Sequence, residues 1–471
     1  MRKSELTREK QRLLWEVSDM VWEIREYGAV DDGRTVNTAV IQNTIDRCHQ
    51  AGGGTVLIEG GVYLCGTIFL RSNVTLEIAQ GTVLKANPDI GDYAENTHHN
   101  RYRNEEALDR CFLYGEDLEN IGICGKGRIE GSSEAFPNKG NIYRPMLIRF
   151  LRCRQIHIED IRLCDAAAWT TAFLDSEYIW ISKVYIHNEK RYNGDGLDFD
   201  GCAHVFIDNC SITGTDDNLC LQSSSKEYPV KDIHISNCEF TSLCAGIRIG
   251  LKSIGDIYNV VISNCTMDRV WREGIKIECT EGGSISDIMI QNVTMRDVTR
   301  PVFMILNNRF KTDDYGSSVE LEQMPEIGRM ENITITHLTA VDSEEMKNTH
   351  YRFGNDIMGE PKFNGIRIDA EEHHPIRDVT LQNICYRSIG GVKKADIPAE
   401  YPPVLDQLRH PGEVTSENYY PDWSRTAYLD IRNVEELYLD NICFECVEPD
   451  EREPYLIENS SILRQDIRVK A

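Results

Sequence analysis

Three aspartates have the residue type and spacing to carry out acid–base chemistry together. Asp195 lies in the stretch NGDGLDFD (193–200), and Asp216 and Asp217 end the stretch GTDD (214–217). Crowded carboxylates repel one another, so at least one pKa is expected to rise, which places a protonated acid beside ionised bases. Hydrolysis of a glycosidic bond needs such a set, an acid for the leaving oxygen and a base for water. Calcium binding, with or without a lyase reaction, and a solvated turn are the competing interpretations.

The elements that must position these aspartates are indicated by an internal repeat. Alternating apolar and polar residues interrupted by Asn recur as VFIDNCSI, IHISNCEF, VVISNCTM and IMIQNVTM, with the Asn at 209, 237, 264 and 292, at intervals of 28, 27 and 28 residues. Alternation with period two predicts strands. A unit of this length with several short strands and no helix predicts one coil of a parallel β-helix, in which the recurring Asn form a structural ladder at the turns.

The repeat relates the sequence separation of the aspartates to their distance in space. Asp195 and Asp216 are 21 residues apart, which is about one coil. One coil along the chain is one layer in space, roughly 4.8 Å. We therefore expect Asp195 to lie beside the Asp216–Asp217 pair on one face.

The remaining segments are expected to frame the β-helix. Residues 1–26 are predicted to be helical, and residues 27–471 to form the catalytic β-helix domain. Residues 35–50, with Val36, Val40, Ile41, Thr44 and Ile45 on one face, are predicted to form a helix that caps the open end of the stack. Long inserts on a rigid scaffold favour walls of a binding site; they lie near 309–330, 343–365 and 393–425.

Composition excludes several classes of function. The chain has 471 residues and a formal net charge of −25, which argues against a general binder of nucleic acid. No run approaches the roughly 18 apolar residues of a membrane span, and no secretory signal is seen at the amino terminus, so a cytoplasmic location is expected unless a signal was trimmed. Homo-oligomer formation stays open. The 16 cysteines, among them Cys210, Cys238 and Cys265 after repeat Asn residues, are interpreted as packed free thiols, not metal ligands or disulfides.

Several motifs resemble glycoside hydrolase family 28, the polygalacturonase family. They are YGAVDDG (27–33), the glycine-rich stretch 52–78, GKGRIEG (125–131), NGDGLD (193–198) and GTDD (214–217). The resemblance implies a right-handed parallel β-helix that hydrolyses by inversion, without a cofactor or a metal. It assigns the general acid to Asp216 and the water-activating base to Asp195 and Asp217, with Asn193 in the family's Asn-Thr-Asp motif.

Departures from the family pattern concern the groups that would hold a sugar carboxylate. The family's Gly-His-Gly falls on Cys244, Ala245 and Gly246, and its Arg-Ile-Lys falls on Lys276, Ile277 and Glu278. A charge-assisted contact is hard to replace by an amide, so the changes favour a neutral sugar such as rhamnose at that subsite. The predicted substrate-binding residues are Asn193, Arg248, Lys276, Glu278, Gln222 (in place of a family Lys), Arg309 and Trp169.

The sequence therefore predicts an inverting glycoside hydrolase that acts from the chain end on short oligosaccharides derived from pectin or a related plant polymer. The expected partner is the oligosaccharide substrate, with no nucleic acid and no membrane. A lyase or epimerase on the same scaffold, and a sugar-binding β-helix without activity, are the alternatives.

Overall fold

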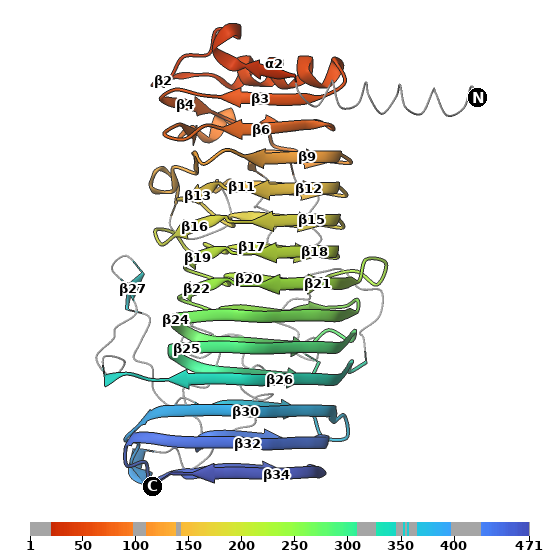
Figure 1. Ribbon diagram of the computed structural model, residues 1–471, viewed down its shortest axis with the longest axis vertical. Coiled ribbons are helices and arrows are strands. Elements are labelled where there is room, and N and C mark those ends of the chain that lie inside the picture. The colour runs from red at the N-terminus through yellow and green to blue at the C-terminus, as the bar shows by residue number, and fades with distance from the viewer. Residues whose placement is uncertain are drawn as a thin grey trace, which may run out of the picture.

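The computed structural model describes residues 20–97, 110–137, 143–308, 326–344, 352–353, 356–357, 365–396 and 425–470. In these residues the chain winds into a stack of coils that runs from the amino-terminal to the carboxyl-terminal end (Figure 1). Parallel pairing joins 32 strands into one sheet, which wraps around the stack as three columns. The fold is a right-handed parallel β-helix, as the repeat and the resemblance predicted. No helix among the described residues is long and apolar enough to cross a membrane.

The first column contains the repeated phrases of the sequence and faces the viewer in Figure 1. Its strands show the inward–outward alternation that predicted them, for example in β18 (Ala203–Asp208). The strands of this column are β1 (Val21–Glu23), β3 (Gly54–Ile58), β6 (Val74–Ile78), β9 (Glu119–Cys124), β12 (Arg154–Glu159), β15 (Glu177–Ser182), β18, β21 (Val230–Ser236), β24 (Ile257–Cys279), β25 (Ser284–Leu306), β26 (Arg329–Val341), β30 (Ile376–Gly390), β32 (Val434–Glu448) and β34 (Ile462–Val469).

The second column follows the turn that carries the repeat Asn. Asn209, Asn237, Asn264 and Asn292 all have φ of 55–57°, the left-handed region that Asn tolerates well. The Asn292 amide donates to Asn264 Oδ1 at 3.1 Å, as in the predicted ladder, whereas Asn237 donates to Asp208. The short strands of this column are β2 (Asp32–Val36), β4 (Val62–Cys65), β7 (Val83–Ala86), β10 (Arg128–Glu130), β13 (Arg162–Cys164), β16 (Tyr185–Asn188), β19 (Ser211–Gly214) and β22 (Glu239–Ser242).

The third column carries the predicted aspartates. Inside it, Phe150, Phe173 and Phe199 stack with ring centroids 5.7 and 4.9 Å apart, which fixes the layers of neighbouring coils on one another. The strands of this column are β5 (Ile68–Phe69), β8 (Cys111–Glu116), β11 (Met146–Leu151), β14 (Thr171–Leu174), β17 (Leu197–Asp200), β20 (Leu219–Ser223), β23 (Ile247–Ser253), the ends of β24 and β25, β29 (Ile366–Ala370), β31 (Thr426–Arg432) and β33 (Glu453–Glu458).

The amino-terminal cap is a helix, but a shorter one than the sequence predicted. Helix α2 spans Thr38–Gln50 and buries Ile41, Thr44 and Ile45 over the first coils. Residues 35 and 36 belong to β2, and Val36 is exposed, because Asn37 bonds to the backbone of Val30 and turns the chain there.

Only residues 20–26 of the predicted amino-terminal helix lie within the described part of the chain, and they do not form an α-helix. Residues 1–19 lie outside the described residues, and 21–27 form β1 and the 3-10 turn η1 (Ile24–Tyr27). Pairing of Val21–Glu23 with Thr55–Leu57 extends the first column by one strand, and this tertiary pairing overrides the local helical pattern.

Most of the three predicted inserts lies outside the described residues. Their described parts include the short irregular segment before β26, a small antiparallel pair of strands, β27 (Arg352–Phe353) and β28 (Asp356–Ile357), and the turn η7 (Lys394–Asp396). Two further 3-10 turns are η2 (Ile90–Asp92) and η4 (Ser133–Ala135).

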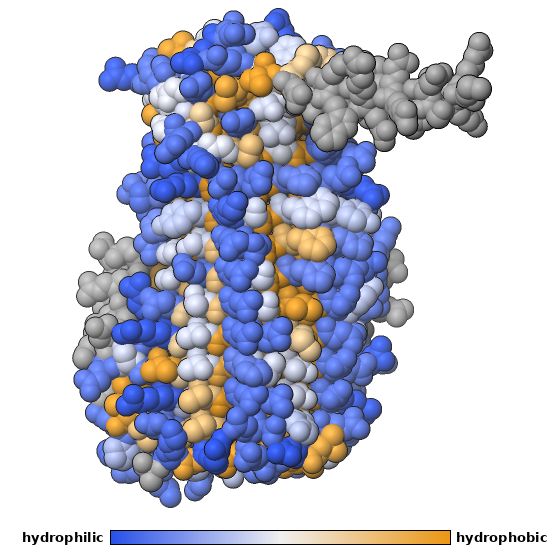
Figure 2. Space-filling view, in the orientation of Figure 1, coloured by the Kyte–Doolittle hydropathy of each residue, from blue (hydrophilic) through white to orange (hydrophobic). Residues whose placement is uncertain are grey.

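The cysteines are all free thiols, and most are buried, as predicted from their positions. Cys210, Cys238 and Cys265 occupy one position in three successive coils. The seams of apolar and polar residues that run along the stack in Figure 2 have the same origin, because equivalent positions of successive coils lie over one another.

Candidate active site

The third column brings Asp195 and Asp217 to equivalent positions of adjacent coils. Thr171, Leu197 and Leu219 pair across β14, β17 and β20, and Asp195 and Asp217 each lie two residues earlier. The backbone N–H of Gly196 donates to the carbonyl oxygen of Asp217 at 3.0 Å. The predicted juxtaposition therefore holds, but Asp195 is in register with Asp217 and not with Asp216, because this coil has 22 residues.

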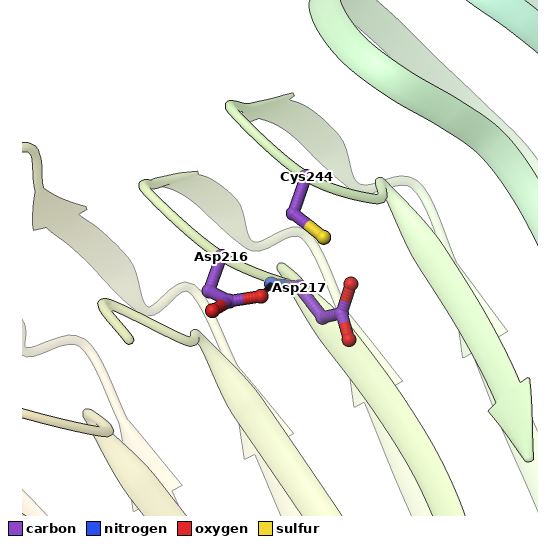
Figure 3. A group of neighbouring side chains, drawn as sticks. All are labelled: Asp216, Asp217 and Cys244. Carbon is purple, nitrogen blue, oxygen red and sulfur yellow. Dashed lines mark hydrogen bonds between the residues drawn. The ribbon is translucent and has the colours of Figure 1, made fainter. Parts of the chain in front are cut away.

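Asp216 and Asp217 lie on one turn, and Cys244 lies on the corresponding turn of the next coil (Figure 3). A carboxylate oxygen of each aspartate and the Cys244 Sγ lie within 4.8 Å of one another. The Ser242 hydroxyl donates to the Asp216 carbonyl oxygen at 2.6 Å and accepts from the Cys244 N–H at 2.8 Å, which ties the two turns together.

The environment of Asp216 favours its protonated form. Burial raises the pKa of its carboxyl above the usual range, and the neighbouring charge of Asp217 raises it further. Arg272 and Arg248 act in the opposite direction without reversing the shift. A carboxyl group in this state can donate a proton.

The environment of Asp217 favours its ionised form. Burial alone would raise the pKa of Asp217, but the charges of Arg248 and Lys276 outweigh burial and lower it. The Arg248 Nη1 lies 2.5 Å from the Asp217 Oδ2, and both side chains are largely buried. Two adjacent carboxyl groups are thus driven in opposite directions, which is the arrangement that acid–base hydrolysis requires.

Asn193 connects this pair to a buried cation. The Arg144 Nη2 donates to the Asn193 Oδ1 at 2.7 Å, which orients the amide so that its Nδ2 donates to the Asp216 Oδ2 at 3.3 Å. Arg144 is fully buried, and burial lowers its pKa, while the charges of Asp195 and Asp216 act in the opposite direction without reversing the shift. The sequence analysis missed Arg144, because it lies 49 residues before Asn193 and outside the repeated phrases.

Two of the predicted substrate-binding cations, Arg248 and Lys276, are bound by carboxylates of the chain itself. Arg248 Nε lies 3.0 Å from Glu278 Oε2, and the Lys276 ammonium lies 3.5 Å from Glu273 and 3.7 Å from Glu278. Arg300 pairs with the other oxygen of Glu273 at 3.3 Å. Lys276 has no exposed surface. The cluster thus joins three cations to Asp217, Glu273 and Glu278, and the gained Glu278 links Arg248 to Lys276.

The other predicted binding residues occupy different places. The Gln222 amide donates to the Cys220 Sγ at 2.9 Å in the same strand. Trp169 is in register with Asp195 one coil earlier, and its ring contacts Lys252. Arg309 lies outside the described residues.

The ligand atoms at this site indicate whether it could bind a calcium ion. Asp216, Asp217 and Cys244 form a group of three ligand atoms close enough to share an ion. A thiolate suits borderline and soft metals, whereas Ca²⁺ takes oxygen ligands. The Arg248 guanidinium already supplies a positive charge to Asp217. These residues therefore fit a calcium ion poorly.

Comparison with known proteins agrees with the fold and identifies the family of the chain. The family model of glycosyl hydrolases family 28 matches residues 71–385, about two thirds of the chain, and the chain belongs to this family. A probable polygalacturonase of Vitis vinifera is 26% identical over 318 residues, which are 63% of each chain. An exo-poly-alpha-D-galacturonosidase of Dickeya chrysanthemi is 22% identical over 68% of this chain and 62% of its own length.

The chain thus spans less than two thirds of the length of these two relatives. Among solved structures, the family 28 exopolygalacturonase of Yersinia enterocolitica matches 96% of this chain and 78% of its own, with a TM-score of 0.67 and 16% identity. This structural match supports the β-helix fold.

Proposed function

We propose that the protein is an inverting glycoside hydrolase with Asp216 as the general acid and Asp217 and Asp195 as the groups that activate water. The observation that carries the proposal is the opposite pKa shift of two adjacent aspartates, raised at Asp216 and lowered at Asp217. Asp195 supports it because it lies at the position equivalent to Asp217 in the adjacent coil.

The proposed reaction is a single displacement. Asp216 gives its proton to the glycosidic oxygen as the bond from that oxygen to the anomeric carbon breaks. Water attacks the anomeric carbon from the opposite side, and its proton passes to Asp217 or Asp195. Asn193 positions Asp216 through the hydrogen bond between them. No cofactor enters this sequence of steps.

We further propose that the sugar beside the cation cluster is neutral, such as rhamnose or another side-chain sugar of pectin. Arg248 and Lys276 each lie within ion-pair distance of a carboxylate of this chain. A uronate brought to the same place would compete with Asp217 or Glu278 for these cations and would meet two buried negative charges.

Action from the end of an oligosaccharide is supported by the burial of the third column on both sides of the aspartates. Towards the amino terminus, the outward-facing Tyr114, Met146 and Leu174 are at most 5% exposed. Towards the carboxyl terminus, Phe303 and Arg367 are at most 3% exposed. A long open cleft would leave such residues exposed, so the substrate is proposed to enter a pocket. The cytoplasmic location expected from the sequence stays a prediction.

The test is a screen of α- and β-linked aryl glycosides, including rhamnosides and galacturonides, together with pectic oligosaccharides, with the first-formed anomer followed by NMR. We expect turnover of a neutral-sugar glycoside with inversion. Appearance of the retained anomer would contradict the mechanism, and turnover of galacturonides alone would contradict the assignment of the sugar. Glu278→Lys, which restores a cation at the family position, is expected to shift the preference towards galacturonides.

A lyase or epimerase that uses a cation is the second candidate, because Asp216, Asp217 and Cys244 have the spacing of metal ligands. It predicts activity that is lost with a chelator and restored by a metal, and a lyase would also form an unsaturated product that absorbs ultraviolet light. We expect a chelator to leave the hydrolysis rate unchanged. A sugar-binding protein without activity would bind the oligosaccharides but release no product.

A further inference from the structure

One contact crosses the third column next to the aspartates. The ammonium of Lys252, in β23, lies 5.4 Å from the centroid of the Trp169 ring, which precedes β14. Strands β17 and β20 lie between the two residues in the column. At about 4.8 Å for each step between neighbouring strands, β14 and β23 are about 14 Å apart. The two side chains must therefore extend towards each other over the outward face of β17 and β20.

The backbone of β23 is distorted at the point that directs Lys252 there. Leu221 pairs with Ile249 and Ser223 with Ser253, so one residue of β20 faces three of β23. Such a bulge re-aims side chains, and bulges are frequent beside active sites. Gly250 has φ of 94° and Leu251 has φ of 50°. Leucine adopts this conformation at a cost, which marks the bulge as a feature that the surrounding structure enforces.

The residues under this contact are buried although their side chains point outward, away from the core of the stack. Asp198, Asp200 and Gln222 alternate with core residues of β17 and β20, and they are 3–6% exposed. Lys252 and Trp169 are themselves 7% and 8% exposed. The pair and its surroundings therefore close the outward face of β17 and β20, the strands that follow Asp195 and Asp217.

The contact also defines what Trp169 can do. Its indole packs in an apolar cluster with Tyr114, Met146 and Leu174, and one side of the ring is covered by the Lys252 ammonium. A sugar that stacked on that side of the ring would have to displace the cation. Trp169 thus suits a wall of the site better than a platform on which a sugar stacks.

We infer that Lys252 and Trp169 form a wall over β17 and β20 that ends the sugar-binding site beside the aspartates, and that Lys252 is a specificity-determining residue that restricts the enzyme to terminal sugars. The inference rests on the proposed hydrolysis at Asp216 and adds to it the residues that limit the length of the substrate. Lys252 acts by occupying the space into which a longer sugar chain would extend.

The experiment compares the wild type with Lys252→Ala on two pectic series, oligogalacturonides and rhamnogalacturonan oligosaccharides, each as short and six-residue chains. The ratio of kcat/KM for the long chain to that for the short one is expected to rise about tenfold when the wall is removed. The first products are expected to change from monosaccharides to longer fragments. Lys226→Ala, an exposed lysine in the preceding coil, is the matched control and should keep the wild-type ratio.

An unchanged ratio and unchanged first products in a folded Lys252→Ala protein would overturn the inference while leaving hydrolysis at Asp216 intact. Internal cleavage by the wild type, or turnover of neither series, would also overturn it. Equal turnover by the wild type and Asp216→Asn would instead reject the proposed function. Should Lys252→Ala not fold, Lys252→Ser is judged by the same criterion, with thermal unfolding as the measure of folding.

Discussion

The first and third columns are built from the same coils and differ in their outward-facing residues. In the first column, outward residues of β15, β18 and β21 are partly or fully exposed. In the third column, every residue of β14, β17 and β20 is buried. Both columns bury apolar residues inside the stack, so the inward-facing residues stabilise the fold in each. Only the outward-facing residues distinguish the column that carries the candidate site from the column that does not.

The chemistry of the two outward layers differs accordingly. On the first column, His157, Trp180, Phe206 and His234 stack with nearly parallel rings, at interplanar angles of 4–9°. Their faces contact one another, which is typical of a ladder that supports the sheet. On the third column, the outward residues near the aspartates include Asp198, Arg248 and Lys276, which are charged and largely buried. Burial of charge is costly unless it is compensated, and it therefore points to function.

The largest expected effect is the loss of the proton donor on the third column. Asp216→Asn should reduce kcat by about 10²–10⁴, the usual contribution of a positioned general acid. The measurement is the steady-state rate on the best substrate of the screen. Asp208→Asn on the first column, where the carboxylate accepts from Ser236, should keep the wild-type rate.

The inward layer gives the next test. Phe199→Ala removes the last ring of the Phe150–Phe173–Phe199 stack beneath β17 and should lower the free energy of unfolding by about 3–5 kcal/mol. Phe206→Ala, on the outward layer of the neighbouring strand β18, removes a ring that is 38% exposed and should cost far less. Denaturant unfolding of the two variants measures the difference, and equal costs would show that the two layers contribute alike.

A smaller and more specific effect is expected in the pH profile. Asp217 must be ionised to act as a base, and Arg248 lowers its pKa. Without that cation Asp217 takes up its proton at a higher pH, so Arg248→Met should move the acid limb of kcat/KM upward. The alkaline limb, governed by Asp216, should move in the same direction, because Arg248 also lowers the pKa of that group. Arg269→Met, an exposed cation that pairs with Asp268, should leave the profile unchanged. A shift of the acid limb to lower pH would contradict the role of Arg248.

Much of the fold follows from the sequence because its signals are local. Alternation predicts the strands, and Asn at a fixed place in each coil predicts the turn, as the left-handed φ of Asn264 and Asn292 confirms. Within the segment predicted to be helical, Val21–Glu23 forms a strand instead, because it pairs with a strand more than 30 residues away.

Only those residues of the candidate site that the repeat places in adjacent coils could be predicted from the sequence. One-coil spacing brings Asp195 next to the Asp216–Asp217 turn, but the register differs by one residue, since the length of a coil varies. Arg144 and Lys252 were not found, because one comes from outside the repeated phrases and the other reaches the site through a bulge that no alternation predicts.

The repeated left-handed corner after each strand of the first column has a consequence for how such a molecule can change. Because Asn209, Asn237, Asn264 and Asn292 turn the backbone in the same way, each corner returns the chain to the same starting direction. A whole coil on the carboxyl-terminal side of the aspartates could be gained or lost while the coils on the amino-terminal side kept their positions. Overall length and chemistry are thus separable properties of this architecture, and insertions of whole coils should be tolerated where single-residue insertions within a strand are not.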